Sequence, residues 1–279
     1  MYNCYLCTIK WRGKRGERGE NVMIRRSAHI GVFALLIVVM SMTVCCKHGA
    51  ANKPLLVDSV VVDTSTVVGK NNGAHYHLSL NIKTLADSTY RGLNIALIDS
   101  LLTPNIVDLY DTVSISPRER IEQYIKSNFA AYKAFYGTVY AEEPQNGTAS
   151  TDYNLTTAME YNDDGIVNYT GTVESVQNGQ TTTYTTALNI NLEQRRILSL
   201  SDVVPNPSDE KFIGDIVKHL CKQVGANDQA SLESAGYFTH TPPYAPENFI
   251  LGSNTITFIY IPGEIADREK GEIRVSISR

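Results

Sequence analysis

The chain has 279 residues, with 25 Lys and Arg side chains against 29 Asp and Glu. Residues 1–45 contain seven of the basic and two of the acidic side chains, which leaves 18 against 27, a net charge of −9, in residues 46–279. This acidic balance argues against a nucleic-acid-binding protein and against a polybasic membrane-binding surface, because both require positive charge. We therefore expect no nucleic acid among the partners.

The first recognisable element is the apolar stretch MIRRSAHIGVFALLIVVMSMTVCCKHG at residues 23–49. Arg25 and Arg26 precede an uncharged run that ends at Cys46, which is the arrangement of an export signal. The apolar core, residues 30–44, is shorter than the ~20 residues that a transmembrane helix needs. The sequence thus favours a cleaved signal over an uncleaved membrane anchor.

A cysteine directly after such a core resembles the bacterial lipoprotein signal, in which that cysteine is acylated and becomes the new N-terminus. Cys46 fits best, because Thr43, Val44 and the small Cys45 precede it, and Cys45 is the alternative. Two ordinary thiols at the end of an apolar core are the remaining interpretation. The resemblance implies a lipid-anchored protein of the cell envelope with the membrane as its first partner.

The segments around this signal follow from the same interpretation. Residues 1–22 are interpreted as an upstream start-site artefact, with Met23 as the alternative start, residues 23–45 as the lipoprotein signal peptide and residues 46–56 as a tether. Surface-sorted lipoproteins of the Bacteroidetes type often carry acidic residues just after the lipidated cysteine. Because residues 47–53, KHGAANK, contain none, we expect the periplasmic face rather than the cell surface.

The mature chain begins with a predicted strand pair and two predicted helices. Alternating, β-branched stretches at 57–68 and 74–85 flank GKNNG and predict a hairpin. Leucines at helical spacing predict a helix over 89–103, and a capping box begins a second helix after Ser116. The apolar stripe of the second helix is expected to pack against a sheet. It consists of Ile121, Tyr124, Ile125, Phe129 and Tyr132.

The rest of the chain is predicted to form strands interrupted by one helix. A two-residue period over 152–161, 166–176 and 181–192 predicts an antiparallel meander, a helix is expected to begin near Ser208 or Asp209, and the chain closes in three strands. The predicted fold class is α+β, with antiparallel sheets packed with a few amphipathic helices. We expect an N-terminal α+β region at 57–200 and a C-terminal domain at 201–279.

The C-terminal residues resemble a known family. The segments that carry the resemblance are the hairpin around Gly252 and the P-x-E-I-A sequence at 262–266. They resemble the closing hairpin and loop of domain-of-unknown-function family 3298 (DUF3298), with a likeness over residues 185–279, and residues 57–184 loosely resemble family 4163. The resemblance implies an extracytoplasmic α+β binding module, as in a lysozyme-sensing anti-sigma factor and beside the catalytic domain of a cell-wall deacetylase.

Few residues suggest a catalytic or metal-binding role. His75 and His77 alternate on a predicted strand and are weak candidates for a ligand or metal site, since both would point to one face without a third ligand at suitable spacing. For Glu160 and Glu174 the sequence favours solvated strand carboxylates; the alternative is that they face each other across a hairpin, as the paired carboxylates of glycoside hydrolases do. Cys221 is expected to be a buried apolar side chain. No nucleophile, metallohydrolase or phosphate-binding motif is present, so we predict no catalytic residue, metal or cofactor.

These observations favour a non-catalytic, lipid-anchored envelope protein that binds a macromolecular ligand. A cell-wall component, a glycan and a lysozyme-like protein are the candidate ligands. The alternative is a hydrolase of polysaccharide or cell wall that uses acidic residues. The two hypotheses differ in geometry, because the enzyme requires a cleft with two converging carboxylates.

Overall fold

The computed structural model describes residues 55–69, 73–102, 115–142, 149–162 and 165–279, with the side chains of 138–142 excepted. Its strands are β1 (Val57–Val68), β2 (Ala74–Leu85), β3 (Ser150–Tyr161), β4 (Val167–Gln177), β5 (Gln180–Asn191), β6 (Arg196–Leu198), β7 (Phe249–Leu251), β8 (Thr255–Tyr260) and β9 (Ile273–Ser278). Its helices are α1 (Arg91–Leu102), α2 (Pro117–Glu142), α3 (Leu200–Val203), α4 (Glu210–Val224) and α5 (Gln229–Ser234), with 3-10 turns at Ser88–Tyr90 and Arg268–Lys270. The predicted α+β class is confirmed.

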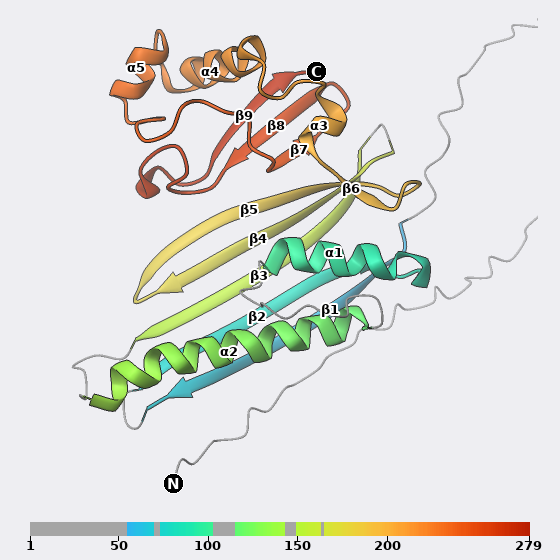
Figure 1. Ribbon diagram of the computed structural model, residues 1–279, viewed down its shortest axis with the longest axis vertical. Coiled ribbons are helices and arrows are strands. Elements are labelled where there is room, and N and C mark those ends of the chain that lie inside the picture. Colours follow the sequence, from blue (N-terminus) through green and yellow to red (C-terminus); the bar gives the residue numbers. More distant parts are fainter. Residues whose placement is uncertain (1–54, 70–72, 103–114, 143–148, 163–164) are drawn as a thin grey trace, which may run out of the picture. The chain divides into compact units, whose positions relative to one another are not determined.

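A six-stranded sheet with the order β1-β2-β3-β4-β5-β6 forms the larger layer (Figure 1). The predicted hairpin of β1 and β2 and the predicted meander of β3, β4 and β5 both form, with antiparallel pairing. Asn178 and Gly179 adopt positive φ angles of 51° and 82° at the tip of the β4–β5 hairpin. The Asn-Gly pair therefore forms the tight turn that its sequence favours.

One strand pair departs from the antiparallel expectation. β2 and β3 run parallel, in a register that pairs His75 with Ser150 and Asn81 with Thr156. A parallel pair requires a crossover, because the chain must return to the same end of the sheet before the second strand begins. The segment that contains α1 and α2 supplies this crossover.

Both helices of the crossover lie over one face of the six-stranded sheet (Figure 1). The inward residues of β2 alternate with exposed or half-buried ones, and Leu78, Leu80 and Ile82 are fully buried. The predicted capping box begins α2, since the Ser116 N–H donates to Glu119 Oε2 at 2.6 Å and the Glu119 N–H donates to Ser116 Oγ at 3.2 Å. The amphipathic helices thus cover the apolar side of the sheet.

A second hydrophobic core lies in the C-terminal part, under the antiparallel sheet β7-β8-β9. Helix α4 begins at its N-cap Asp209, as predicted, and its buried residues Ile216, Val217, Leu220 and Cys221 contribute to this core. Both cores belong to one compact unit that includes Leu55–Arg279. The proposed division into regions 57–200 and 201–279 stays a prediction.

The two sheets are joined by side chains that bind strand backbones. Asn248 Oδ1 accepts from the Ala187 N–H at 2.7 Å, and its Nδ2 donates to the Thr185 carbonyl at 2.8 Å. Asn189 is 1% exposed, and its amide binds β7 through the Phe249 carbonyl and the Leu251 N–H at 2.8 and 2.9 Å. These bonds satisfy backbone groups at a strand edge that would otherwise lack partners.

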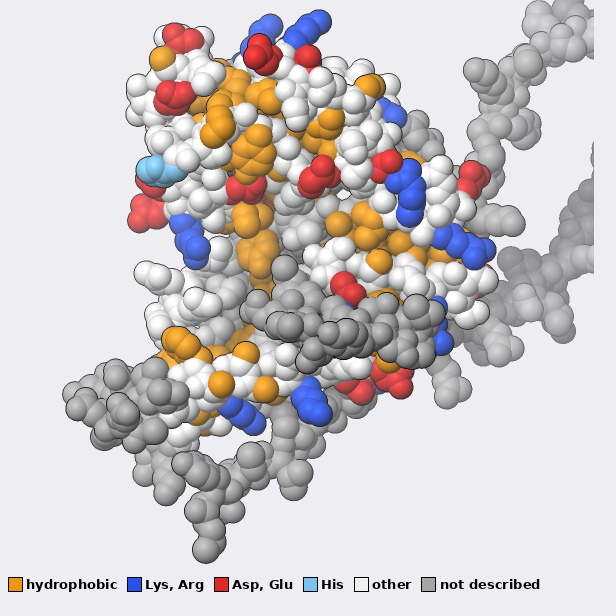
Figure 2. All heavy atoms as spheres, viewed as in Figure 1, with side chains coloured by type: hydrophobic (Ala, Val, Ile, Leu, Met, Phe, Trp, Pro, Cys, Tyr) orange, Lys and Arg blue, Asp and Glu red, His pale blue; other side chains and the backbone are white. Residues whose placement is uncertain are grey.

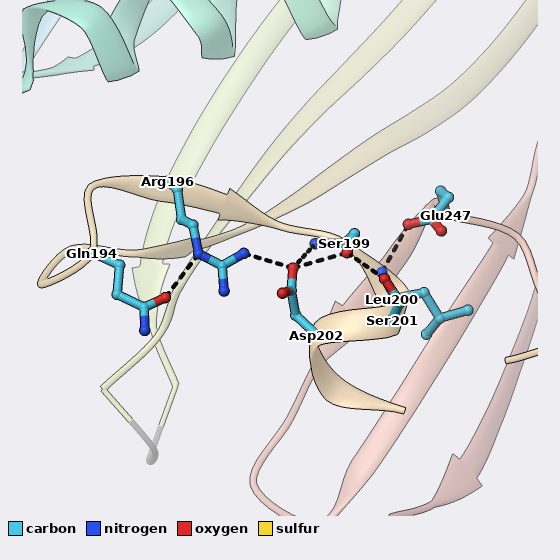
Figure 3. Close-up of polar contacts among 7 residues, drawn as sticks. All are labelled: Gln194, Arg196, Ser199, Leu200, Ser201, Asp202 and Glu247. Atoms are coloured by element: carbon cyan, nitrogen blue, oxygen red, sulfur yellow. Dashed lines mark hydrogen bonds and ion pairs between the residues drawn. The ribbon is translucent and has the colours of Figure 1, made fainter. Parts of the chain in front are cut away.

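A compact polar cluster lies between β6 and α3, where the chain leaves the six-stranded sheet (Figure 3). Asp202 Oδ2 accepts from Arg196 Nη1 at 2.7 Å and from the Ser199 N–H at 2.7 Å. The Arg196 bond, followed by the bonds from Ser199, holds the pKa of the Asp202 carboxyl well below its usual value of 3.8. The cluster fixes the start of α3, where Glu247 accepts from the Leu200 N–H.

Among the described helices, none is long and apolar enough to cross a membrane.

Candidate ligand-binding groove

The aromatic stripe of α2 changes its environment along the helix. Tyr124 and Phe129 are buried in the larger core, as the spacing predicted. Tyr132 is only partly buried, and Phe135 is 66% exposed. The expectation that the stripe is core is therefore confirmed up to Phe129. Beyond it, Phe135 is exposed, and Figure 2 shows hydrophobic side chains at the surface over α2.

The partly exposed rings form a continuous stack that reaches into the core. The Tyr76 ring on β2 stacks on Tyr132 at a centroid distance of 4.9 Å and an interplanar angle of 22°. Tyr132 contacts Tyr136 at 4.5 Å, and Tyr136 meets Phe135 edge-on at 4.9 Å. Because each ring is supported by the next, the exposed members are held in fixed positions.

These rings form one wall of an open groove of about 400 Å³ between α2 and the ends of β3 and β4. Its size lies within the range of ~300–1000 Å³ that is typical of small-molecule sites. The groove is lined by Tyr76, Tyr124, Ser127, Asn128, Ala131, Tyr132, Phe135, Tyr136, Thr151, Tyr153, Ser175, Gln177 and Asn178. Among these described lining residues, none carries a carboxylate, an ammonium, a guanidinium or an imidazole.

Hydrogen bonds fix the polar groups around the groove. Tyr132 Oη donates to the His75 carbonyl at 2.9 Å, which ties α2 to β2. Asn128 Nδ2 donates to Tyr124 Oη at 3.1 Å, and Asn178 Oδ1 accepts from the Ser150 N–H at 3.2 Å. These bonds hold the side chains of Asn128, Tyr132 and Asn178 against α2, β2 and β3.

Tyr76, Tyr124 and Tyr153 of the groove remain neutral at physiological pH. Burial, with a smaller effect from Tyr184, raises the pKa of Tyr124 to about 12. Burial is also the main cause that raises the pKa of Tyr76 and of Tyr153 above the usual value of 10.0, and neighbouring tyrosines add to it. The groove therefore presents neutral hydroxyl, amide and aromatic groups.

The histidines singled out in the sequence lie outside this groove. His75 is exposed on β2, and His77 lies between two carboxylates, with Nε2 3.0 Å from Asp63 Oδ1 and Nδ1 3.4 Å from Asp152 Oδ1. Within the described ranges, no group of three or more His, Cys, Asp or Glu residues is arranged to hold a metal ion. His77 thus contacts neighbouring carboxylates on a partly exposed sheet face.

The alternative in which Glu160 and Glu174 face each other is wrong. In the β3–β4 register Glu160 faces Asn168, and Glu174 faces Asn154. Glu160 and the partner of Glu174, Asn154, are six positions apart along β3, which is roughly 20 Å at the usual strand rise. Retaining and inverting glycosidases hold their carboxyl groups within ~10 Å, so this pair does not form such a site.

Two further predictions concern cysteines. The lipidation candidates Cys46 and Cys45 lie outside the described residues, so acylation stays a prediction. Cys221 is buried with its thiol free, as predicted, in the core beneath the C-terminal sheet.

A second concavity, of about 550 Å³, lies beside β6 and α3. Its lining includes Arg196 and Asp202, but these side chains bind each other, and Arg196 Nε donates to Gln194 (Figure 3). Because these charges already satisfy one another, the aromatic groove is the stronger candidate for a ligand site.

Comparisons with known proteins identify the fold. No protein-family model matches the chain, and no curated protein matches it. A DUF3298 crystal structure from Bacteroides fragilis NCTC 9343 superposes with a TM-score of 0.66 and 20% identity, covering 81% of this chain and 91% of that one. A DUF3298 protein from Pseudomonas aeruginosa PAO1 gives a TM-score of 0.52 and 13% identity, covering 81% and 92%.

The chain has the DUF3298 fold. The resemblance found at its C-terminal end is thereby confirmed at the level of fold, and the likeness extends well beyond residues 185–279, because it covers 81% of the chain. The DUF3298 fold here consists of the six-stranded sheet with its helices and the three-stranded sheet. The loose resemblance of residues 57–184 to family 4163 stays a prediction.

Proposed function

We propose that the protein belongs to DUF3298 and acts as a lipid-anchored, non-catalytic binding module of the cell envelope. The lipoprotein-like signal that ends at Cys46, or alternatively at Cys45, supports the membrane tether. The periplasmic face is the proposed location. The protein then holds a macromolecular ligand, such as a cell-wall component, a glycan or a lysozyme-like protein, close to the membrane.

The observation that carries the binding function is the uncharged aromatic groove along α2. Its rings contact one another, and Phe135, which lies beyond the buried part of the α2 stripe, remains 66% exposed. Tyrosine and phenylalanine at partly open sites provide large, rigid contact areas with little loss of side-chain entropy on binding. A groove without acids, bases or nucleophilic pairs supports binding rather than turnover.

A retention assay tests this function. The full chain extracted from membranes is incubated with isolated peptidoglycan, with surface polysaccharide and with proteins of the lysozyme fold. We expect selective retention by one class and a loss of about 10-fold in affinity for Phe135→Ala and Tyr132→Ala, since each removes a ring from the stack.

Leu56→Ala is the matched control, because Leu56 is a 71% exposed apolar residue that does not line the groove. It should bind as the unchanged protein does. The proposal is overturned if no class is retained selectively, or if retention is the same in the groove variants and the control. Hydrolysis of a retained polysaccharide would favour the alternative enzyme.

A further inference from the structure

Resting on the proposed function, we infer that the ligand of the α2 groove is an uncharged glycan chain. The first argument is charge. The lining residues of the groove carry no charged side chain. A ligand charge that enters such a site loses its hydration without gaining a partner, which is strongly unfavourable. The acidic body of the protein, with 18 basic and 27 acidic side chains after residue 45, adds repulsion against anionic ligands.

The second argument is the pairing of flat rings with neutral hydrogen-bonding groups. Tyr132, Tyr136 and Phe135 present aromatic surface on one wall. The opposite side contributes hydroxyls and amides from Thr151, Ser175, Gln177 and Asn178. A pyranose ring matches both walls, because its C–H faces pack on aromatic rings while its hydroxyls, or an N-acetyl group, exchange hydrogen bonds with neutral side chains.

The third argument favours a glycan over an extended peptide as the ligand. Peptides that bind beside a sheet gain most of their affinity by pairing with a free strand edge. The strands beside the groove have no free edge there, because β3 is paired with β2 and β4, and β4 is paired with β3 and β5. The available contacts are side-chain contacts, which suit sugar hydroxyls. The open groove of about 400 Å³ accommodates a few sugar units, while the rest of the glycan extends outside the groove.

Titration calorimetry with defined oligosaccharides tests the inference. The probes are neutral oligomers of N-acetylglucosamine, glucose and mannose, with a uronic acid oligomer as the charged comparison. We expect at least one neutral oligomer to bind, with an affinity that is unchanged between about 0.05 and 0.5 M salt, because screening acts only on charges. The uronic acid oligomer should not bind.

Two substitutions at one position separate ring stacking from folding. Phe135→Tyr keeps an aromatic face and should retain the affinity, whereas Phe135→Ala should weaken it about 10-fold. Both variants should unfold at the same urea concentration as the unchanged protein, since Phe135 is mostly exposed. Gln177→Glu places a carboxylate in the groove and should also weaken neutral-glycan binding.

The outcomes distinguish this inference from the proposed function. If no neutral oligosaccharide binds but Phe135→Ala abolishes retention by a lysozyme-fold protein, the glycan inference is overturned and the binding function stands. If the charged oligomer binds more tightly than every neutral one, the inference is also overturned. If groove substitutions change no interaction at all, both fail.

Discussion

Asn189 of β5 binds the backbone of β7, and Asn248, the residue before β7, binds the backbone of β5 in return. Each side-chain amide donates one hydrogen bond and accepts one, as a neighbouring strand would. The edges of two separate sheets are thereby joined through side chains, with further bonds from Asn162 and Asn168 to the Leu251 carbonyl, instead of through a continuous ladder of strands.

Removing one of these amides should destabilise the whole fold. Asn189→Ala leaves the Phe249 carbonyl and the Leu251 N–H without these partners at a buried position. We expect the free energy of unfolding to fall by roughly 1–3 kcal/mol. Urea denaturation followed by circular dichroism measures this change.

Asn206→Ala is the control, since Asn206 is exposed. Its effect should stay within about 0.5 kcal/mol. The double variant Asn189→Ala with Asn248→Ala should lose less than the two single losses combined, because both residues secure the same junction. Strict additivity would contradict this reciprocal role.

The contact between α1 and β4 leaves no room for a side chain at Gly171. A Cβ atom there would lie 2.6 Å from Leu101 Cδ2 and 3.2 Å from Leu155 Cδ1, and both leucines are buried. Gly171→Ala should therefore cost about 1–3 kcal/mol of stability. Thermal unfolding measures the effect. Gly214→Ala in α4, where nothing lies within 4 Å, should instead raise stability by up to about 1 kcal/mol.

Acid should selectively weaken the cluster at the start of α3. The pKa of Asp202 is lower in the folded protein than its ordinary 3.8 because Arg196 and Ser199 donate to it. The ionised carboxylate therefore stabilises the fold above pH 3.8, and this contribution is lost as the pH falls through the folded-state pKa. Asp202→Asn should be less stable than the unchanged protein at pH 7, with a smaller difference at pH 3.

Urea midpoints at the two pH values check the prediction for Asp202. Asp267→Asn provides the comparison, because Asp267 is exposed and its side chain makes no capping bond. A difference for Asp202→Asn that grows towards pH 3 would argue against the assigned hydrogen bonds.

Ligand binding in the groove should not depend on pH between about 5 and 9. Burial keeps the pKa of Tyr124 near 12 and that of Tyr76 and Tyr153 above the ordinary value, so their hydroxyls stay protonated throughout this range. Affinity measured at three pH values with one retained ligand checks this expectation. A midpoint near pH 6 or 7 would place an ionising group in the complex that the described groove lacks.

The predicted cleavage and acylation at Cys46 are tested by measuring the intact mass of the protein. If Cys46 is acylated, membrane-extracted protein should begin at Cys46 and carry the added mass of a diacylglyceryl group. Cys46→Ser should release the protein from the membrane, whereas Cys45→Ser should leave it anchored. A mature protein that retains Met1 and no lipid would overturn the lipoprotein interpretation.

Local sequence signals predicted the secondary structure well. The bounds of β1 and β2 match the alternating stretches, and Asp209 and Ser116 act as N-caps because their side chains bind the first free N–H groups of each helix. The parallel pairing of β2 with β3 has no comparable local signal, since it depends on where a crossover returns the chain.

The candidate groove was missed for a related reason. Helical spacing identifies the face on which Tyr124, Phe129 and Tyr132 lie, but it does not show where the covering layer ends. The three residues share one pattern, although only the first two are fully covered. Similarly, alternation placed Glu160 and Glu174 on strands, whereas only the register determines which residues they face.

The crossover between β2 and β3 has a consequence for the folding chain. His75 and Ser150 are register partners 75 positions apart, whereas the β1–β2 hairpin closes locally. The second edge of β2 therefore stays unpaired until the long segment between the two strands has been ordered, and this long loop closure is intrinsically slow. Because an unpaired strand edge is a template for aggregation, a chaperone that shields strand edges in the compartment where the chain folds would act most usefully before Ser150 to Thr156 pair with β2.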